Sequence, residues 1–131
     1  MISKEQLNEI AVKSGLSLYQ QEKDYLLKVF LYHYYQHNDH AIFKGGTCLK
    51  YLFGLNRFSE DLDFNIKDVK KFQEEVKQVL KELELLGIQN YFIKEEIFED
   101  AYICEIGFQG PFYKGTNQTR NKFRIDAGYR L

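Results

Sequence analysis

Hydrophobic residues recur with helical spacing in the first third of the chain. Ser3 and Gln6 occupy the positions of a capping box, which predicts a short helix that ends before Gly15. Residues 19–35 carry apolar and aromatic side chains around most of the circumference of a second predicted helix. A helix with apolar residues on nearly all sides is typical of a buried element. The first forty residues are therefore expected to be helical.

Two further helices are predicted downstream. Residues 49–53 form a short helical patch, and Gly54 is placed to end it. Asp68 can cap a long amphipathic helix whose apolar residues recur every three to four positions up to Gly87. Both predictions depend on the spacing of apolar residues and on a glycine at the expected end.

Short apolar runs and period-two alternation predict the strands. Residues 41–43 are an apolar run, and residues 61–66 alternate strictly between polar and apolar side chains. Further strand-like segments lie at 91–97, 101–108 and 123–129. Since helices lead and strands trail, with one helix between strands, the pattern favours an α+β or α/β fold, with a mixed sheet flanked by helices.

Length and composition fit one globular domain. The 131 residues include 18 Lys+Arg against 19 Asp+Glu, and 44% are hydrophobic, which excludes a disordered chain and a basic DNA-coating protein. No apolar stretch approaches the ~18 residues of a membrane span, and the polar N-terminus lacks a signal-peptide pattern. Cys48 and Cys104 form neither a disulfide framework nor a metal-binding spacing. We expect a cytoplasmic protein with no membrane partner.

Charge is distributed unevenly along the second half of the chain. Residues 82–105 hold seven acidic side chains against one lysine, and residues 110–131 hold five basic side chains against one aspartate. Such asymmetry can mark a surface for nucleic acid or phosphate on a neutral protein. Solvated strand faces and loops are the ordinary alternative.

The candidate chemistry lies in two short segments. Asp61 and Asp63 are two apart on a predicted strand, so their carboxylates share one face, where they repel each other unless a cation such as Mg²⁺ neutralises them. Gly45 and Gly46 follow a strand and allow backbone N–H groups to approach a phosphate, and Thr47 can add a hydroxyl at the start of a helix. Neither segment is specific alone, but together they suit nucleotidyl or phosphoryl transfer.

These segments resemble a known family. Lys-Gly-Gly-Thr-x-Leu at 44–49, followed by Arg-Phe-Ser-Glu-Asp-Leu-Asp-Phe at 57–64, is similar to the signature of the AbiEii/AbiGii-type nucleotidyltransferase toxins, which belong to the polymerase-β-like nucleotidyltransferase superfamily. Glu-Lys-Asp-Tyr at 22–25 resembles a motif ahead of the family's first core strand. Phe-Arg-Ile-Asp at 123–126 matches the place of a third acidic residue.

The resemblance implies a polymerase-β-like nucleotidyltransferase fold and a set of residue roles. Asp61, Asp63 and Asp126 would be catalytic and would hold Mg²⁺ or Mn²⁺, with Asp126 bridging to a metal or helping to deprotonate the attacking hydroxyl. Gly46 and Thr47 would grip the triphosphate. The full set of nucleotide-binding residues that the resemblance implies is Lys44, Gly45, Gly46, Thr47, Arg57 and Ser59.

The same resemblance implies a function and a domain organisation. The chain would transfer a nucleotide from an NTP to an acceptor hydroxyl, with RNA or tRNA as acceptor, as a toxin of a bacterial toxin–antitoxin or phage-defence system with an antitoxin partner. Residues 1–131 would form one nucleotidyltransferase domain, with N-terminal helices at 1–40 and a catalytic core at 41–131. The family's C-terminal helical part is expected to be missing, which would leave apolar sheet surface exposed and favour self-association.

Two alternatives remain open at this stage. A transferase that uses a sugar nucleotide could also hold its diphosphate through Asp61, Asp63 and a metal, although the Gly-Gly-Thr turn suits a triphosphate. A non-catalytic or truncated domain could bind a nucleotide or a protein without turnover. NTP binding in the absence of transfer would identify that second alternative.

Overall fold

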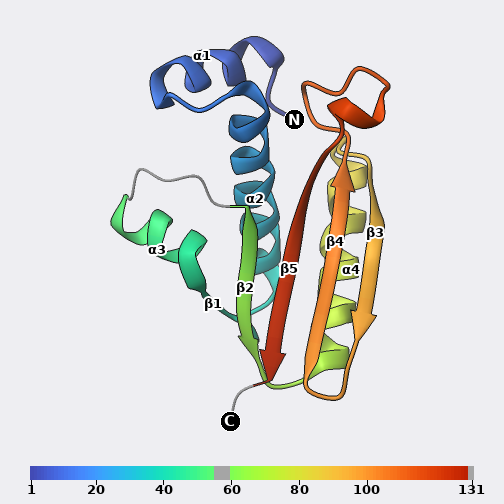
Figure 1. The fold of residues 1–131 in the computed structure, drawn as a ribbon. Helices are drawn as coiled ribbons and strands as arrows, with labels where there is room; N and C mark the ends of the chain where they lie inside the picture. Colours follow the sequence, from blue (N-terminus) through green and yellow to red (C-terminus); the bar gives the residue numbers. More distant parts are fainter. Residues whose placement is uncertain (55–59, 130–131) are drawn as a thin grey trace.

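The computed structural model describes residues 1–54 and 60–129 of the chain. Within this part, five strands form one sheet accompanied by four α-helices and a short 3₁₀ helix (Figure 1). The helices are α1 (Lys4–Ser14), α2 (Leu18–His37), α3 (Gly45–Phe53), α4 (Val69–Leu85) and the 3₁₀ helix η1 (Asn117–Thr119). The strands are β1 (Ile42–Lys44), β2 (Asp61–Ile66), β3 (Asn90–Ile97), β4 (Ala101–Phe108) and β5 (Asn121–Tyr129).

The sheet is mixed, with the strand order β1-β2-β5-β4-β3. β2 and β5 run parallel, and the other neighbouring strands are antiparallel. This confirms the prediction of an α+β fold with a mixed sheet and flanking helices. The parallel pair is formed by strands more than fifty residues apart in the sequence, so the centre of the sheet depends on a long-range pairing.

The predicted helix ends are largely confirmed. Ser3 forms a capping box with Gln6 at the start of α1, and Gly15 ends that helix with a φ of 77°. The Asp68 side chain accepts a hydrogen bond from the Lys71 backbone N–H at the start of α4. α2 begins one residue before the predicted 19–35, where Ser17 forms a second capping box with Gln20, and it ends two residues later, at His37. The capping signal at Ser17 was not used in the prediction.

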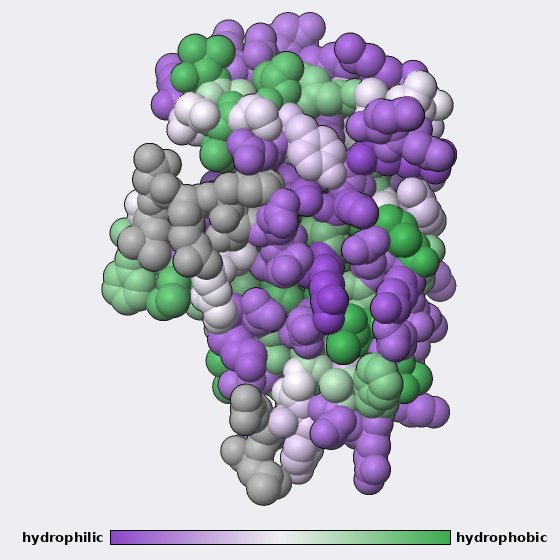
Figure 2. Space-filling view, in the orientation of Figure 1, coloured by the Kyte–Doolittle hydropathy of each residue, from purple (hydrophilic) through white to green (hydrophobic). Residues whose placement is uncertain are grey.

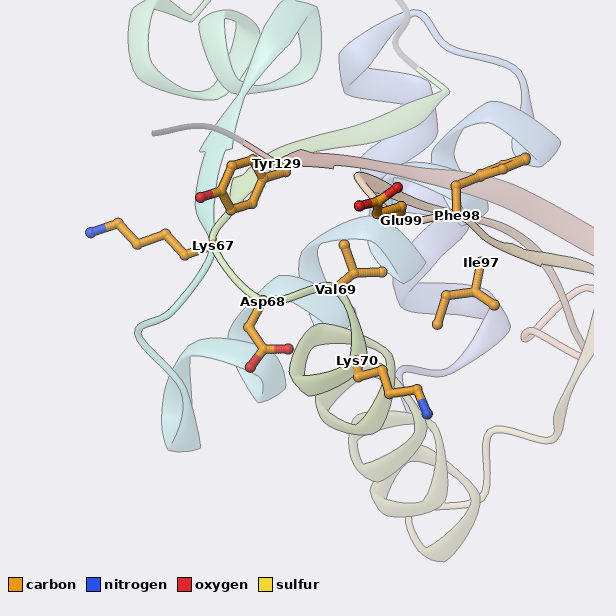
Figure 3. Close-up of a pocket in the computed structure, with 8 residues that line it drawn as sticks. All are labelled: Lys67, Asp68, Val69, Lys70, Ile97, Phe98, Glu99 and Tyr129. Atoms are coloured by element: carbon orange, nitrogen blue, oxygen red, sulfur yellow. The ribbon is translucent and has the colours of Figure 1, made fainter.

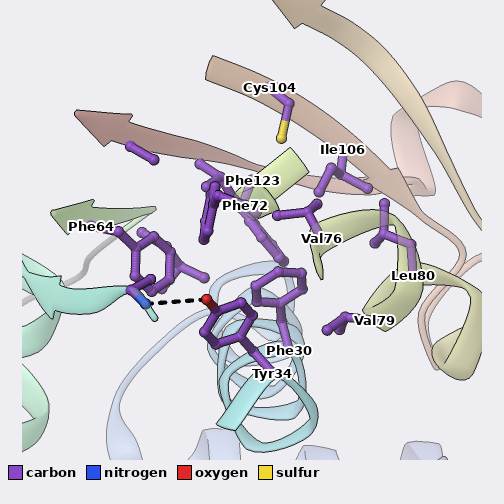
Figure 4. Close-up of a cluster of buried hydrophobic side chains, with 14 of the residues drawn as sticks. Phe30, Tyr34, Phe64, Phe72, Val76, Val79, Leu80, Cys104, Ile106 and Phe123 are labelled. Atoms are coloured by element: carbon purple, nitrogen blue, oxygen red, sulfur yellow. Dashed lines mark hydrogen bonds between the residues drawn. The ribbon is translucent and has the colours of Figure 1, made fainter. Parts of the chain in front are cut away.

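One face of the sheet packs against α2 and α4 and forms the core (Figures 1 and 4). Aromatic rings from both layers meet there: Tyr34 lies 5.9 Å from Phe64 and 5.7 Å from Phe72, which are 5.3 Å from each other, all measured between ring centroids. The buried Tyr34 hydroxyl accepts a hydrogen bond from the Ala41 backbone N–H and donates one to Glu75. Because a buried polar atom is costly without partners, these bonds allow tyrosine in an otherwise apolar core.

The opposite face of the sheet is not covered by a helix in the described part of the chain, and we call it the open face. Figure 2 shows it as largely hydrophilic. The outward residues of β2 and β5 are mostly charged, whereas β3, at the edge of the sheet, carries the exposed side chains of Tyr91, Ile93 and Ile97. Part of the sheet surface is therefore apolar and exposed, as expected, and Leu52 and Phe53 of α3 are also 71% and 70% exposed. Self-association stays a prediction. No helix among the described residues is long and apolar enough to cross a bilayer.

Candidate active site

β2 presents two aspartates on the open face of the sheet. Leu62 and Phe64 are fully buried against the helices, so the alternate residues Asp61 and Asp63 point the other way. The apolar side chains anchor the strand, and this anchoring fixes the direction in which the carboxylates project. The prediction that Asp61 and Asp63 share one face of a strand is confirmed.

β5 adds the third carboxylate. Because β5 runs parallel to β2, Asp126 stands directly beside Asp63 in the register, and Arg124 stands beside Asp61. Ile125 and Ala127 are buried, so the Asp126 side chain also lies on the open face. Arg124 donates a hydrogen bond to Asp126 Oδ2 over 3.3 Å. The structure thus places the three carboxylates that the sequence singled out on one face of the sheet, with Asp63 and Asp126 as direct neighbours.

The electrostatics of the pair on β2 reflect this crowding. Burial raises the pKa of the Asp63 carboxyl above its ordinary value, and repulsion from Asp126 and Asp61 raises it further. Burial also raises the pKa of Asp61, with an added contribution from the nearby charge of Glu60. A divalent cation would remove this repulsion, so the donor set fits a hard metal ion.

Gly45 lies in direct contact with the Asp63 side chain. A Cβ placed on Gly45 would lie 2.6 Å from Asp63 Oδ2 and 3.1 Å from both Cβ and Cγ of Asp63. The φ of Gly45 is +84°, a backbone conformation that side chains disfavour. Only glycine therefore allows the chain to turn from β1 into α3 against Asp63.

The glycines form the first turn of α3. They were expected to form a flexible turn ahead of a helix, but the helix already begins at Gly45. Lys44 is the N-cap residue and gives no side-chain hydrogen bond to the helix. The first N–H groups of a helix have no partner within it, and the helix dipole adds positive potential there. Lys44 also pairs with Asp63 in the register of β1 and β2, which adds its charge to this corner of the open face.

Thr47 connects α3 to β2. Its side chain is 4% exposed, and its hydroxyl donates a hydrogen bond to the Asp61 carbonyl over 2.6 Å. The hydroxyl hydrogen is thus used for positioning, and any phosphate contact from Thr47 would come from its backbone N–H. Arg57 and Ser59, the other predicted nucleotide-binding residues, lie outside the described residues.

Sequence reasoning missed a polar cluster that fixes the far end of α3. Asp24 of α2 is 5% exposed and accepts a hydrogen bond from the Tyr51 hydroxyl over 2.9 Å. It also forms ion pairs with Lys28 at 2.9 Å and Lys50 at 3.4 Å. Burial raises the pKa of Tyr51 well above its ordinary value, and the Asp24 charge raises it further. The charged motif at 22–25, inside a helix predicted to be buried, was the available signal.

Two more polar residues border the carboxylates. Lys23 is 5% exposed and lies 3.8 Å from Glu60, and its charge also acts on Asp61. Asn65 continues the outward series of β2 after Asp63, and its buried Oδ1 has no hydrogen-bond partner among the described residues. The alternating pattern at 61–65 was visible in the sequence, although Asn65 was not singled out.

A metal at this site would depend on more than protein side chains. In residues 1–54 and 60–129, no group of three or more His, Cys, Asp or Glu side chains forms a preformed metal site. Mg²⁺ commonly binds through one or two carboxylates, with water and substrate phosphates completing its coordination. The arrangement around Asp61 and Asp63 fits that mode of binding.

One depression among the described residues lies away from these carboxylates (Figure 3). It has a volume of about 510 Å³ and lies where β2 and β5 end, next to the β3–β4 turn. Lys67, Lys70 and Tyr129 are among its lining residues, whereas Asp61 and Asp63 are not. Its size alone gives no reason to place the chemistry there.

Comparisons with known proteins agree with this geometry. The family model "Nucleotidyl transferase AbiEii toxin, Type IV TA system" matches residues 29–130. The crystal structure of JHP933 from Helicobacter pylori is similar, with a TM-score of 0.63 and 24% identity over 88% of this chain and 46% of that one. A second H. pylori structure, provisionally described as a nucleotidyltransferase, gives a TM-score of 0.63 and 23% identity over 88% of this chain and 47% of that one. This chain thus spans about half the length of those proteins. No curated protein sequence matches.

Proposed function

This chain belongs to the AbiEii family of nucleotidyl transferase toxins of type IV toxin–antitoxin systems, and from that premise we propose that it is a metal-dependent nucleotidyltransferase. In the proposed reaction, an acceptor hydroxyl oxygen bonds to the α-phosphorus of an NTP, and the bond to the departing pyrophosphate breaks. The proposed acceptor is RNA in the cytoplasm, with the end of a tRNA as the first candidate. The contact between Gly45 and Asp63 supports this proposal best, because it joins a helix start to a carboxylate.

The start of α3 serves as the triphosphate site in this proposal. The N–H groups of Gly45, Gly46 and Thr47 lie in the first turn of the helix, where backbone donors and the helix dipole favour a bound anion. Lys44 adds a positive charge beside them. The hydrogen bond from the Thr47 hydroxyl to the Asp61 carbonyl fixes the position of the first turn of α3 relative to β2.

The three aspartates serve as the metal site. Asp61 and Asp63 would hold Mg²⁺ or Mn²⁺, and Asp126 would either be a further ligand or accept the proton of the acceptor hydroxyl. When bound, the divalent ion supplies charge neutralisation for the triphosphate. Asp126 is suited to either role because it stands beside Asp63 in the register, on the same face. Arg124 holds its carboxylate by a hydrogen bond.

The remaining parts of the proposal come from the family. Residues 1–131 are proposed to form one nucleotidyltransferase domain, with helices at 1–40 and the catalytic core at 41–131. Arg57 and Ser59 are proposed to contact phosphate from the segment between α3 and β2. An antitoxin protein is the proposed partner, because the family is one of toxin–antitoxin systems.

A labelling experiment tests the proposal. The chain is incubated with each α-³²P-labelled NTP, Mg²⁺ and total tRNA, and compared with Asp63→Asn and with the control Asp39→Asn, which changes an exposed aspartate in the turn before β1. We expect label on RNA with the wild type and the control, and none with Asp63→Asn. Mg²⁺-dependent NTP binding without transfer would indicate a nucleotide-binding domain, and the absence of both would refute the proposal.

A further inference from the structure

A polar depression lies on the open face where β5 begins. Its volume is about 340 Å³, and its lining includes Tyr19, Tyr91, Arg120 and Lys122. Tyr91, Gly107 and Lys122 form one row across β3, β4 and β5, and a side chain at Gly107 would collide with the Tyr91 ring, 2.4 Å from its Cβ position. Tyr91 therefore lies over the sheet at this point and forms the floor of the depression.

The guanidinium of Arg120 is held rigidly beside this floor. It stacks between the rings of Tyr91 and Tyr113, with its central carbon 5.3 and 5.5 Å from the two ring centres. It donates hydrogen bonds to the Tyr113 hydroxyl and to Asn117 Oδ1, and its Nε has no partner in the described part of the chain. A planar group held in this way loses little entropy on binding a phosphate.

A row of charges leads from the depression to the carboxylates. Lys122, Arg124 and Asp126 alternate with buried residues along β5, so all three lie on the open face. Side chains two apart on a strand recur about every 6.7 Å. This spacing is similar to that between neighbouring phosphates in an extended nucleic-acid strand. The Lys122 and Arg124 side chains are 56% and 47% exposed, and so are accessible to a ligand.

We propose that this depression, with the β5 row, binds the end of a single-stranded RNA acceptor. Arg120 and Lys122 contact its phosphodiester groups, and the strand runs along β5 so that its terminal hydroxyl reaches Asp126. This inference rests on the proposed function, since it assigns the acceptor side of the same site. The depression has to supply no further reaction, because its role is to bind the RNA phosphates through the positive charges of Arg120 and Lys122.

The strand order favours the acceptor over the NTP as the occupant. The proposed triphosphate site at α3 lies on the β1 side of the aspartates, and the depression lies on the β3 side. The two substrates would therefore approach the pair Asp63 and Asp126 from opposite directions. An in-line displacement needs the entering and leaving oxygens on opposite sides of the phosphorus.

Binding of a labelled RNA tests the inference without chemistry. Fluorescence anisotropy is measured with a short 5′-labelled single-stranded RNA, in the absence of NTP and Mg²⁺, over a range of salt concentrations. The variants are Lys122→Ala, Arg120→Lys and Glu105→Gln, because Glu105 lies 3.8 Å from Lys122 and opposes anion binding. Lys81→Ala is the control, since Lys81 is exposed on α4, behind the sheet.

The variants are expected to change the RNA affinity in opposite directions. Lys122→Ala weakens RNA binding several-fold and lowers the salt slope by about 0.7. Arg120→Lys weakens it about tenfold, because the fixed planar fork is lost, and circular dichroism should show an unchanged fold. Glu105→Gln tightens binding, and Lys81→Ala leaves it unchanged.

Three results would overturn the inference. These are the absence of RNA binding by the wild type, equal affinities for Lys122→Ala and Lys81→Ala, and a loss of NTP affinity rather than RNA affinity in the Lys122 and Arg120 variants. The proposed function is tested separately, by the dependence of label transfer on Asp63. RNA binding that requires Lys122 but is not followed by label transfer would support the RNA site in the depression and refute the proposed transfer reaction.

Discussion

The contact between Gly45 and Asp63 can be tested by adding one methyl group. Gly45→Ala has two costs. Its φ of +84° lies in the left-handed half of backbone space, which costs a residue with a Cβ about 1–2 kcal/mol. The new Cβ would also lie 2.6 Å from Asp63 Oδ2, and overpacking of this kind typically costs about 1–3 kcal/mol. Rotating the carboxylate does not relieve it, because Cβ and Cγ of Asp63 are also close.

Gly54→Ala is the matched control at the other end of the same helix. Gly54 has a φ of +63°, but a Cβ there would meet no atom within 4 Å. The control therefore carries the backbone cost alone. Urea unfolding should show that Gly45→Ala loses about 1–3 kcal/mol more than Gly54→Ala. Gly45→Ala should also weaken Mg²⁺-dependent NTP binding, whereas Gly54→Ala should leave this binding unchanged.

A double-mutant cycle identifies the cause. Truncation in Asp63→Ala removes Oδ2, which makes the shortest contact with the new methyl group, and Cγ, and it leaves only Cβ at 3.1 Å, so Gly45→Ala should lose less stability in that background. The coupling energy should be about 1–3 kcal/mol, most of the overpacking part of the cost. Equal losses in both backgrounds, or equal losses for Gly45→Ala and Gly54→Ala, would refute the reasoning and the contact on which it depends.

Three further predictions concern stability and reactivity. Asp63→Asn should raise the thermal midpoint of unfolding at pH 7 while abolishing transfer. The pKa of the Asp63 carboxyl is higher in the folded protein than its unfolded value of 3.8, so ionisation of this carboxyl costs stability as the pH rises above 3.8. The increase in thermal midpoint should therefore disappear below that pH. Tyr34→Phe should lose about 1–3 kcal/mol in urea unfolding because it strips two hydrogen bonds from a buried site, whereas Tyr32→Phe, at a side chain 63% exposed, should change stability by less than about 0.5 kcal/mol. Burial raises the pKa of Cys104 to about 12, so a thiol reagent at pH 8 should label Cys48 in the folded protein and Cys104 only after unfolding.

Local features of this fold could be read from the sequence because they depend on neighbouring residues. The capping box at Ser3 and the end of α1 at Gly15 involve residues within one or two helical turns. The alternation at 61–66 correctly predicted that Asp61 and Asp63 share a face, since side chains in a strand alternate irrespective of its partners.

The pairing of strands could not be read in the same way. Period-two alternation gives the face of Asp126 but not its neighbour, and the parallel register with β2 is what puts it beside Asp63. The contact of Gly45 with Asp63 also needs the antiparallel pairing of β1 and β2. The chemistry of the two segments suggested that Gly45 and Asp63 act together, but only the resemblance to a family added Asp126.

The buried charges of α2 were hidden for a different reason. Hydropathy places Glu22 and Asp24 on the surface, but they are 1% and 5% exposed. Each is buried because a distant segment supplies its partners: Glu22 accepts hydrogen bonds from the Asn121 side chain and the Phe112 backbone N–H, and Asp24 contacts α3. Such compensation becomes visible only once the chain has folded.

The two buried carboxylates of α2 explain how the site tolerates the repulsion around Asp63. This repulsion costs stability, and such a cost persists where the surroundings hold the geometry in place. Asp24 holds the far end of α3, the helix that begins at Gly45, and Glu22 holds the segment that leads into β5, the strand of Asp126. α2 thus positions both α3, which begins beside Asp63, and β5, which carries Asp126. Loosening either anchor should therefore disturb the spacing of the site before it disturbs the core.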